Sequence, residues 1–181
     1  LIHAAAGGVG LLLIQMVKML GGTVIGTVST EAKAELARNA GADEVILYTE
    51  QDFHSEVMRM TDGAGVNVAY DSVGATTFAK SIDCLARFGH MVLYGNASGP
   101  VIEFTPATLG PKGSLFLTRP TLFDYLASRE DLEWRSGDVF TWINDGALKL
   151  RLVHFYPLAE ATAAHQALER RQTTGKVILK P

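Results

Sequence analysis

The chain has 181 residues, of which 48% are hydrophobic, and a formal net charge of −3. This length fits one domain, or one domain with an appendage, and the mixed charges leave no footprint for nucleic acid or an anionic membrane. The single cysteine, Cys84, excludes an internal disulfide and a cysteine-based zinc cluster, and no apolar run is long enough to cross a membrane. We therefore expect a soluble, cytoplasmic protein. Because the chain begins at Leu1, almost inside its first expected strand, we also expect it to be a fragment of a longer protein.

The first residues of the chain carry the clearest local motif. A short apolar strand over residues 2–6 breaks at Gly7 and Gly8, and an apolar helix follows over residues 11–20. The two glycines let the backbone turn tightly and let a pyrophosphate come close, while Gly10 lets the helix lie against the strand. The free N–H groups at the helix start would then face the phosphates. The spacing differs from G-x-G-x-x-G, so a tight turn without a ligand is the alternative.

Strands and helices alternate along the first two thirds of the chain. β-Branched and apolar runs predict strands, and amphipathic runs that end near glycine predict helices. The strands are expected at residues 2–6, 23–28, 44–48, 66–71, 90–94 and 114–118, and the helices at 11–20, 30–39, 52–61 and 77–87. This alternation predicts an α/β fold, a doubly wound parallel six-stranded Rossmann sheet in the order 3-2-1-4-5-6 with helices on both faces.

The pattern changes after residue 120. A charged helical stretch, broken at Gly137, is expected over residues 121–144. A strand-helix-strand tail follows, with its elements at residues 148–155, 159–171 and 177–179. We therefore divide the chain into a dinucleotide-binding domain over residues 1–146 and a C-terminal segment over residues 147–181.

Polar residues or glycines stand at nearly every expected strand end. Ligands of open parallel sheets bind beyond the carboxyl ends of the strands. The residues at these ends include Gly7, Gly8, Ser29, Tyr48, Ser72, Tyr94, Gly95 and Asn96. Each has a structural explanation when taken alone, such as a helix cap for Ser29 or a turn for Asn96. Together they predict a polar edge that would suit a long dinucleotide.

The residues just after the second expected strand bear on the choice between NAD and NADP. A hydroxyl and a cation suit a 2′-phosphate, so Ser29 and Lys33 favour NADP. Glu31 favours NAD weakly, but it lies past the strand end and also fits as an acidic residue in the first turn of a helix. A solvent-exposed helix lysine is the alternative interpretation of Lys33.

The other polar residues predict no metal site and no catalytic group in this chain. The five histidines, His3, His54, His90, His154 and His165, lack the spacing of metal ligands. We expect them to be structural or exposed. No Ser/His/Asp order or carboxylate pair stands out, and Asp71 is expected to form a turn or a helix cap.

Several motifs together make the sequence resemble the zinc-independent quinone oxidoreductases (zeta-crystallin-like) of the medium-chain dehydrogenase/reductase superfamily. The matching stretches are AAAGGVG at 4–10, GAD at 41–43, YDSVG at 70–74, GNASG at 95–99, KGSLFLTRP at 112–120, YPL at 156–158 and TGK at 174–176. They are spread over nearly the whole chain, so the combination is far more specific than the glycine turn alone.

The resemblance implies an enzyme that reduces quinones or similar conjugated carbonyls with NADPH. Its implied cofactor residues are Gly7, Gly8, Val9 and Gly10 for the pyrophosphate, Ser29, Lys33 and Tyr48 for the 2′-phosphate, Ser72 for the adenosine, and Tyr94, Gly95 and Asn96 for the nicotinamide. Such enzymes work without zinc and commonly form homodimers. They carry an N-terminal catalytic domain, toward which residues 147–181 would return. We expect a homodimer through residues 114–118, and we expect Gly8→Val to abolish cofactor binding while the fold survives.

Two alternatives stay open. A related reductase of enoyl thioesters would use the same cofactor domain, and the missing N-terminal domain would decide between the two substrates. A non-catalytic nucleotide-binding or structural protein is the other alternative, as relatives that serve as lens crystallins suggest.

Overall fold

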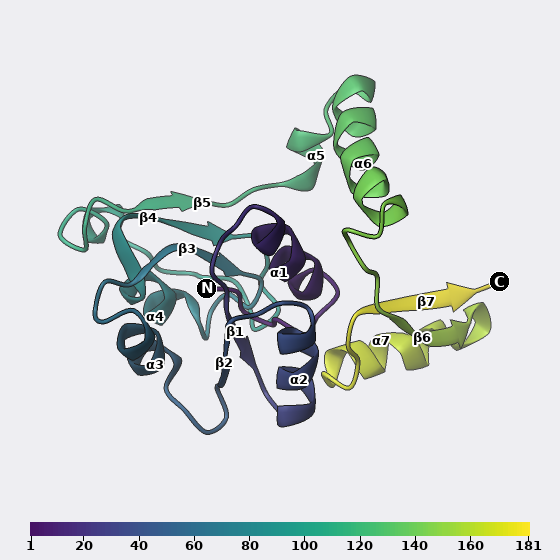
Figure 1. Cartoon of the computed structure of the whole chain (residues 1–181), viewed down its shortest axis with the longest axis horizontal. Helices are drawn as coiled ribbons and strands as arrows, with labels where there is room; N and C mark the ends of the chain where they lie inside the picture. Colours follow the sequence, from purple (N-terminus) through teal and green to yellow (C-terminus); the bar gives the residue numbers. More distant parts are fainter.

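The computed structural model describes residues 1–181 (Figure 1). Its elements in chain order are α1 (Gly10–Met19), β1 (Ile25–Val28), α2 (Glu31–Asn39), β2 (Glu44–Leu47), α3 (Phe53–Met60), β3 (Val66–Asp71), α4 (Phe78–Asp83), β4 (Leu85–Leu93), η1 (Pro106–Thr108), β5 (Phe116–Thr118), α5 (Leu122–Tyr125), α6 (Arg129–Asn144), β6 (Leu152–Pro157), η2 (Leu158–Glu160), α7 (Ala161–Glu169) and β7 (Lys176–Lys180). The alternation of helices and strands confirms the predicted α/β class.

The predicted six-stranded sheet is wrong, because the strands form one parallel pair, β1 with β2, and one parallel set of three, β3-β4-β5. The expected first strand is reduced to Ile2, which forms parallel bridges to Gly26 in β1 and to Tyr70 in β3. The chain leaves the extended conformation at Ala4, whose φ is +51°. Through Ile2 the two sets still lie side by side, with β1 and β3 as the inner strands, as in the predicted order.

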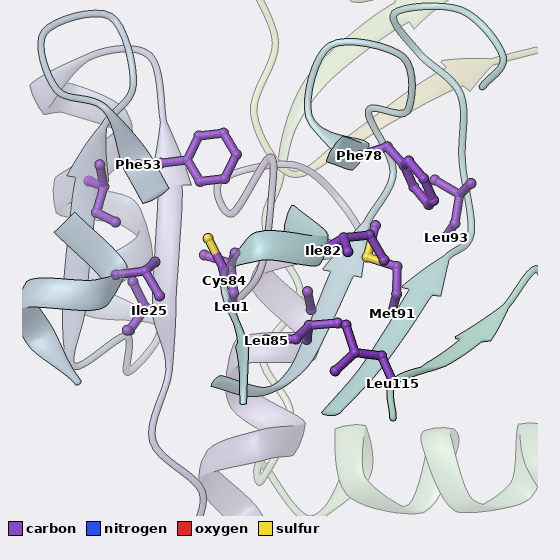
Figure 2. Close-up of a cluster of buried hydrophobic side chains, with 13 residues drawn as sticks. Leu1, Ile25, Phe53, Phe78, Ile82, Cys84, Leu85, Met91, Leu93 and Leu115 are labelled. Atoms are coloured by element: carbon purple, nitrogen blue, oxygen red, sulfur yellow. The ribbon is translucent and has the colours of Figure 1, made fainter. Parts of the chain in front are cut away.

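Two hydrophobic clusters lie on opposite faces of these strands. Alternate residues of β1 point to opposite sides, so Ile25 joins one cluster and Val28 joins the other. The first cluster takes side chains from α3 and α4, among them Phe53, Phe78 and Ile82 (Figure 2). The second takes Ile14 of α1 together with Ala34 and Ala37 of α2. Helices therefore cover both faces, as the sequence predicted.

Short-range contacts set the ends of several helices. The Asp52 carboxylate accepts a hydrogen bond from the Ser55 N–H (3.0 Å) at the start of α3. Helix α4 ends at Asp83, before the expected residue 87. The Val66 N–H donates to the Cys84 carbonyl (2.8 Å), which draws the chain into β4 directly after this helix.

After β5, helices α5 and α6 lie away from the sheets (Figure 1). Helix α6 runs through Gly137, so the predicted break there is wrong. The break precedes α6, where the Ser128 hydroxyl accepts from the Asp131 N–H (3.0 Å) and caps the helix. Strand β6 begins at Leu152 rather than at residue 148 and pairs in parallel with β7, with α7 between them in sequence. The predicted strand-helix-strand tail is thus present with a shifted first strand.

The tail returns to the glycine turn. Gly175 forms a parallel bridge with Gly7, and its N–H donates to the Ala6 carbonyl (3.1 Å). On the other side of α1, the Lys149 N–H donates to Gln15 Oε1 (2.8 Å). No helix of this chain combines the length and the apolar character needed to cross a membrane.

Candidate functional site

A cavity of about 560 Å³ lies at the carboxyl ends of β1, β2 and β3. Ligand pockets commonly have volumes of about 300–1,000 Å³, so its size suits a small organic ligand. Of the eleven residues that the sequence analysis assigned to the cofactor, it is lined by Gly7, Ser29, Lys33, Tyr48 and Ser72. The others, which do not line it, are Gly8, Val9, Gly10, Tyr94, Gly95 and Asn96.

The glycine turn forms one wall of the cavity. Ala4, Ala6 and Gly7 line it, and the Gly7 N–H donates to the Ala4 carbonyl (2.9 Å) to close the turn. A Cβ at Gly10 would lie 2.4 Å from the Ala4 carbonyl oxygen and 2.7 Å from that of Ala5. Only glycine therefore lets α1 begin this close to the preceding segment, as predicted.

The start of α1 is open to an anion. No backbone carbonyl accepts a hydrogen bond from the N–H of Gly8, Val9 or Gly10. The helix has no side-chain cap and no acidic residue in its first turn. These consecutive donors, and the positive end of the helix dipole, follow directly on the turn that lines the cavity. This arrangement suits a phosphate group.

The expected effect of Gly8→Val needs correction. A Cβ at Gly8 would lie 2.8 Å from the Gly175 carbonyl oxygen and 3.0 Å from the Lys176 side chain. A branched side chain there would therefore displace the start of β7. Loss of cofactor binding in that variant would not by itself identify the pyrophosphate site.

Two cations and a phenol meet at one end of the cavity. Lys33 Nζ donates to the Arg171 carbonyl oxygen (2.7 Å), and Arg171 Nη1 lies 3.4 Å from Tyr48 Oη. Ser29, at the end of β1, lines the same cavity. Lys33 comes from the first turn of α2, Tyr48 follows β2, and Arg171 follows α7. Three separate parts of the chain thus build one positively charged site.

The loops after β3 and β4 pack tightly together. The Asp71 carboxylate accepts from the Val73 N–H (2.7 Å) and from the Thr77 hydroxyl (2.7 Å), which confirms its expected role in a turn. The Tyr94 N–H donates to the Asp71 carbonyl (2.9 Å), and a Cβ at Gly95 would lie 2.5 Å from the Ser72 carbonyl. Burial raises the pKa of Tyr94. These contacts place residues 94–96 directly behind the cavity wall.

His3 is a lining residue that the sequence analysis treated as structural or exposed. The side chain is buried, with Nδ1 2.9 Å from Thr27 Oγ1 and Nε2 2.8 Å from Ser81 Oγ. Its ring packs edge-on against Phe53, with 4.9 Å between centroids. Burial lowers the pKa of His3 to about 4, against the opposing effect of Asp71.

Several other lining residues had no local signal in the sequence. They include Gln51, Asp52, Phe53, Thr76, Thr77, Lys80, Leu168, Arg171 and Thr173. Lys80 of α4 pairs with Asp52, the N-terminal cap of α3, and its hydrogen bond lowers the pKa of Asp52 to about 2. Arg171 stands beside Arg170 in the sequence, but nothing in that spacing places it next to Lys33.

The chain offers no obvious nucleophile and no metal site. Cys84 is fully buried in the first hydrophobic cluster, and burial raises its pKa to about 12. No group of three or more His, Cys, Asp or Glu residues is placed to hold a metal ion. The cavity is lined instead by a glycine and by hydroxyl, amide and charged side chains that can contact a ligand through hydrogen bonds.

Residues 8–134 match the family described as zinc-binding dehydrogenase. The chain belongs to this family. The zinc-binding dehydrogenase match begins in the glycine turn and ends in α6, so it covers the strands whose ends line the cavity. The absence of a metal-binding group concerns this chain alone, and zinc independence of the complete protein stays a prediction.

Several curated relatives match this chain over its whole length. Quinone oxidoreductase 1 of Escherichia coli is 46% identical over 183 residues, which cover 100% of the chain and 56% of the relative. A 2-haloacrylate reductase of a Burkholderia species is 45% identical, covering 100% of the chain and 55% of the relative. The crystal structure of the Escherichia coli quinone oxidoreductase complexed with NADPH matches 99% of this chain and 56% of its own, with a TM-score of 0.95. The chain thus spans about half the length of these relatives.

Proposed function

We propose that this chain is the cofactor-binding half of an NADPH-dependent quinone oxidoreductase. The observation that carries the proposal is the cluster of Lys33, Tyr48 and Arg171 at one end of the cavity. Two cations and a phenolic hydroxyl suit the 2′-phosphate, which distinguishes NADPH from NADH. The similarity to an NADPH-complexed quinone oxidoreductase supports the same cofactor.

Each part of the cavity has a proposed share of the dinucleotide. Gly7, Gly8, Val9 and Gly10 would hold the pyrophosphate through backbone N–H groups at the start of α1. Ser29, Lys33 and Tyr48, joined by Arg171, would hold the 2′-phosphate. Ser72 would lie near the adenosine, and Tyr94, Gly95 and Asn96 near the nicotinamide. The bound nicotinamide supplies the hydride, and this chain's residues bind it, orient it and shield it from water.

The proposed substrates are quinones and similar conjugated carbonyl compounds. Relatives named as quinone oxidoreductase and as 2-haloacrylate reductase are equally similar to this chain, at 45–46% identity. Both kinds of acceptor carry a double bond conjugated to a carbonyl or carboxyl group. A solved enoyl reductase is more distant, at 25% identity and a TM-score of 0.83, so enoyl thioesters are the weaker alternative.

Binding and turnover are tested separately. Calorimetric titration of the 181-residue chain with NADPH and NADH is expected to give binding that favours NADPH. Assays of the full-length protein against quinones, 2-haloacrylates and enoyl thioesters then identify the acceptor. Failure of the chain to bind NADPH contradicts the cofactor assignment, and failure of the full-length protein to turn over any acceptor favours the non-catalytic alternative.

We propose that the boundary at residue 146 separates the cofactor domain from a segment that belongs with the remaining domain. The chain covers 55–56% of the curated relatives, so we expect it to lack much of the substrate site. It should bind NADPH without reducing quinone. Appreciable quinone reduction by the chain alone would show that the substrate site lies within it. Zinc independence and a cytoplasmic location of the complete protein belong to the same proposal.

A further inference from the structure

His3 joins several elements around the cavity. Its ring nitrogens contact Thr27 of β1 and Ser81 of α4, and its edge meets Phe53 of α3. The side chain is 1% exposed, although it lines the cavity together with Thr27 and Phe53. One side chain therefore connects β1 with both helices on that face, and it does so directly before the glycine turn.

The hydrogen bonds of Ser81 define the tautomer of the ring. The Ser81 hydroxyl donates its proton to the Thr77 carbonyl oxygen (2.9 Å), so toward His3 it accepts. His3 Nε2 therefore carries the proton. Nδ1 then accepts from the Thr27 hydroxyl (2.9 Å), and both ring nitrogens are satisfied in a neutral imidazole.

The same chain of hydrogen bonds continues to the turn after β3. Thr77, whose carbonyl accepts from Ser81, donates its own hydroxyl to the Asp71 carboxylate (2.7 Å). The other carboxylate oxygen of Asp71 accepts from the N–H groups of Val73 (2.7 Å) and Gly74 (3.1 Å). Val73 and Thr77 both line the cavity. A continuous network thus runs from His3 to the backbone of residues 73 and 74.

We propose that His3, as the neutral Nε2–H tautomer, is the positioning residue that fixes the cavity wall against which the adenosine half of the dinucleotide lies. This inference rests on the proposed NADPH site. His3 acts through Thr27 on one side and through Ser81, Thr77 and Asp71 on the other. Because it supports the wall and not the cationic end, it contributes equally to NADPH and NADH binding.

Three replacements at residue 3 separate the roles of the two nitrogens. In His3→Gln the amide reaches the position of Nε2 and keeps a donor for Ser81, whereas in His3→Asn it stays near Nδ1 and keeps a partner for Thr27. His3→Leu removes both hydrogen bonds. His165→Gln, at an exposed position of α7, is the matched control. Kd values are measured for NADPH and NADH, well below the melting temperature of each variant.

We expect His3→Leu to weaken both coenzymes about tenfold, the size of one net hydrogen bond. His3→Gln should stay within about threefold of the parent, because the connection to Ser81 is kept. Ser81→Ala should add little to His3→Leu, since both remove the same connection. A purely structural histidine would lower the melting temperature and leave both Kd values unchanged, and that result overturns the proposal.

Histidine side-chain ¹H–¹⁵N spectra provide a readout that does not need binding of the variants. His3 is expected to show the neutral Nε2–H tautomer at neutral pH, and its resonances should move when NADPH is added while those of His165 stay. A charged ring, the Nδ1–H tautomer or an unmoved resonance in NADPH-saturated protein contradicts the proposal. If the parent binds NADPH and the His3 variants bind it equally well, only the role of His3 fails. If the parent binds neither coenzyme, the proposed function itself fails.

Discussion

At the scale of single residues, we expect Lys33 to take part in recognition of the coenzyme. Its ammonium is already held by the Arg171 carbonyl (2.7 Å), and this bond directs it to the end of the cavity where Tyr48 lies. A phosphate at this point would meet an ordered lysine instead of a freely moving one, so little side-chain entropy is lost on binding. Lys33 is therefore predicted to make a large contribution to the coenzyme preference, beside Arg171 and Tyr48.

Lys33→Ala is expected to weaken NADPH about ten- to hundredfold and to leave NADH nearly unchanged. A hydrogen bond to a charged group contributes about 1.5–3 kcal/mol, and only NADPH offers the phosphate that receives it. The preference should also shrink as salt rises, because the site is partly exposed. Lys18→Ala is the control, because it removes a lysine of α1 that pairs with Asp43 and does not line the cavity. Equal losses for the two coenzymes would show that Lys33 supports the fold and does not bind the phosphate.

The single residue His3 is also expected to make the free energy of unfolding depend on pH. Burial lowers the pKa of His3 to about 4, whereas its ordinary value in the unfolded chain is about 6.5. Between these two pH values the unfolded chain binds a proton at His3 and the folded chain does not. Stability must then fall as the pH drops from 6.5 toward 4. At pH 4.5 the expected loss from this group is about 2–3 kcal/mol relative to pH 7.5.

Urea unfolding of the parent and of His3→Gln at several pH values measures this loss. As the pH falls from 6.5 toward 4, the difference in unfolding free energy between the two proteins should become smaller, because only the parent loses the contribution of His3. The depressed pKa values of Asp43, Asp52 and Asp131 act mainly near and below their ordinary value of 3.8, and they are common to both proteins, so they cancel in this difference. A difference that stays constant from pH 7.5 to pH 4.5 would contradict the assignment of a neutral buried ring.

At the scale of elements, the start of α1 depends on Gly10, because the chain leaves no room there for a Cβ atom. The Cβ position of Gly10 lies 2.4 Å from the Ala4 carbonyl, whereas nothing lies within 4 Å of the Cβ position of Gly137 in α6. The same substitution should therefore have opposite effects in the two helices. Gly10→Ala is expected to destabilise the protein by about 1–3 kcal/mol or more through overpacking, while Gly137→Ala stabilises it by about 0.5–1 kcal/mol through helix propensity.

Chemical unfolding of both glycine variants, followed by circular dichroism, tests this pair. Gly10→Ala should also weaken NADPH, because the N–H groups at the start of α1 move with the helix. Gly137→Ala should bind it like the parent. If Gly10→Ala is as stable as the parent, α1 does not pack against the turn as described.

The sequence predicted elements better where local chemistry decides their ends. The helix expected at residues 52–61 is present as α3, with Asp52 as its cap, and glycine turns separate most of the other elements, as expected. The first strand was mistaken because the left-handed conformation of Ala4 has no signature in an apolar run of small residues. The sequence predicts the break at Gly137 and not before α6, because a glycine inside a helical run is a more prominent signal than the serine cap at Ser128. In both cases the residue that ends or starts the element has a type that predicts a boundary less strongly than the types of its neighbours.

Some residues of the cavity could be predicted from the sequence and others could not. Ser29, Tyr48 and Ser72 line the cavity because parallel strands end at one edge, which is a rule of topology that sequence periodicity can predict. Arg171 could not be predicted in this way, because it reaches the cavity only through the return of the tail to the glycine turn. The sequence does not identify His3 as a lining residue, because a buried histidine and an exposed one look alike in sequence.

At the scale of the whole molecule, the tail is part of the cavity wall. Leu168, Arg171 and Thr173 line the cavity, and Gly175 bridges to Gly7. The proposed boundary at residue 146 therefore separates two parts that share one site. Ligand binding should couple them, because a phosphate would engage Lys33 from the first part and Arg171 from the second.

The outer edge of the sheets and the helices that follow it expose apolar surface. β5 pairs only with β4, and Phe116 on it is 53% exposed. Helices α5 and α6, which follow this strand, have no buried residue and expose Phe123 and Trp134. An unpaired strand edge invites pairing, and exposed large apolar side chains are common at sites of protein association.

We therefore predict a homodimer that forms through residues 114–118, and Phe116→Lys is expected to make the protein monomeric. A lysine on this edge strand would place like charges close together across a two-fold axis, and charged edge strands oppose pairing. Leu20→Lys, at an 87% exposed position after α1, adds the same charge away from the edge and should leave the dimer intact. Sedimentation velocity at high micromolar concentration measures both variants beside the parent. A parent that stays strictly monomeric there, or a Leu20→Lys variant that dissociates as completely as Phe116→Lys, contradicts pairing through this strand.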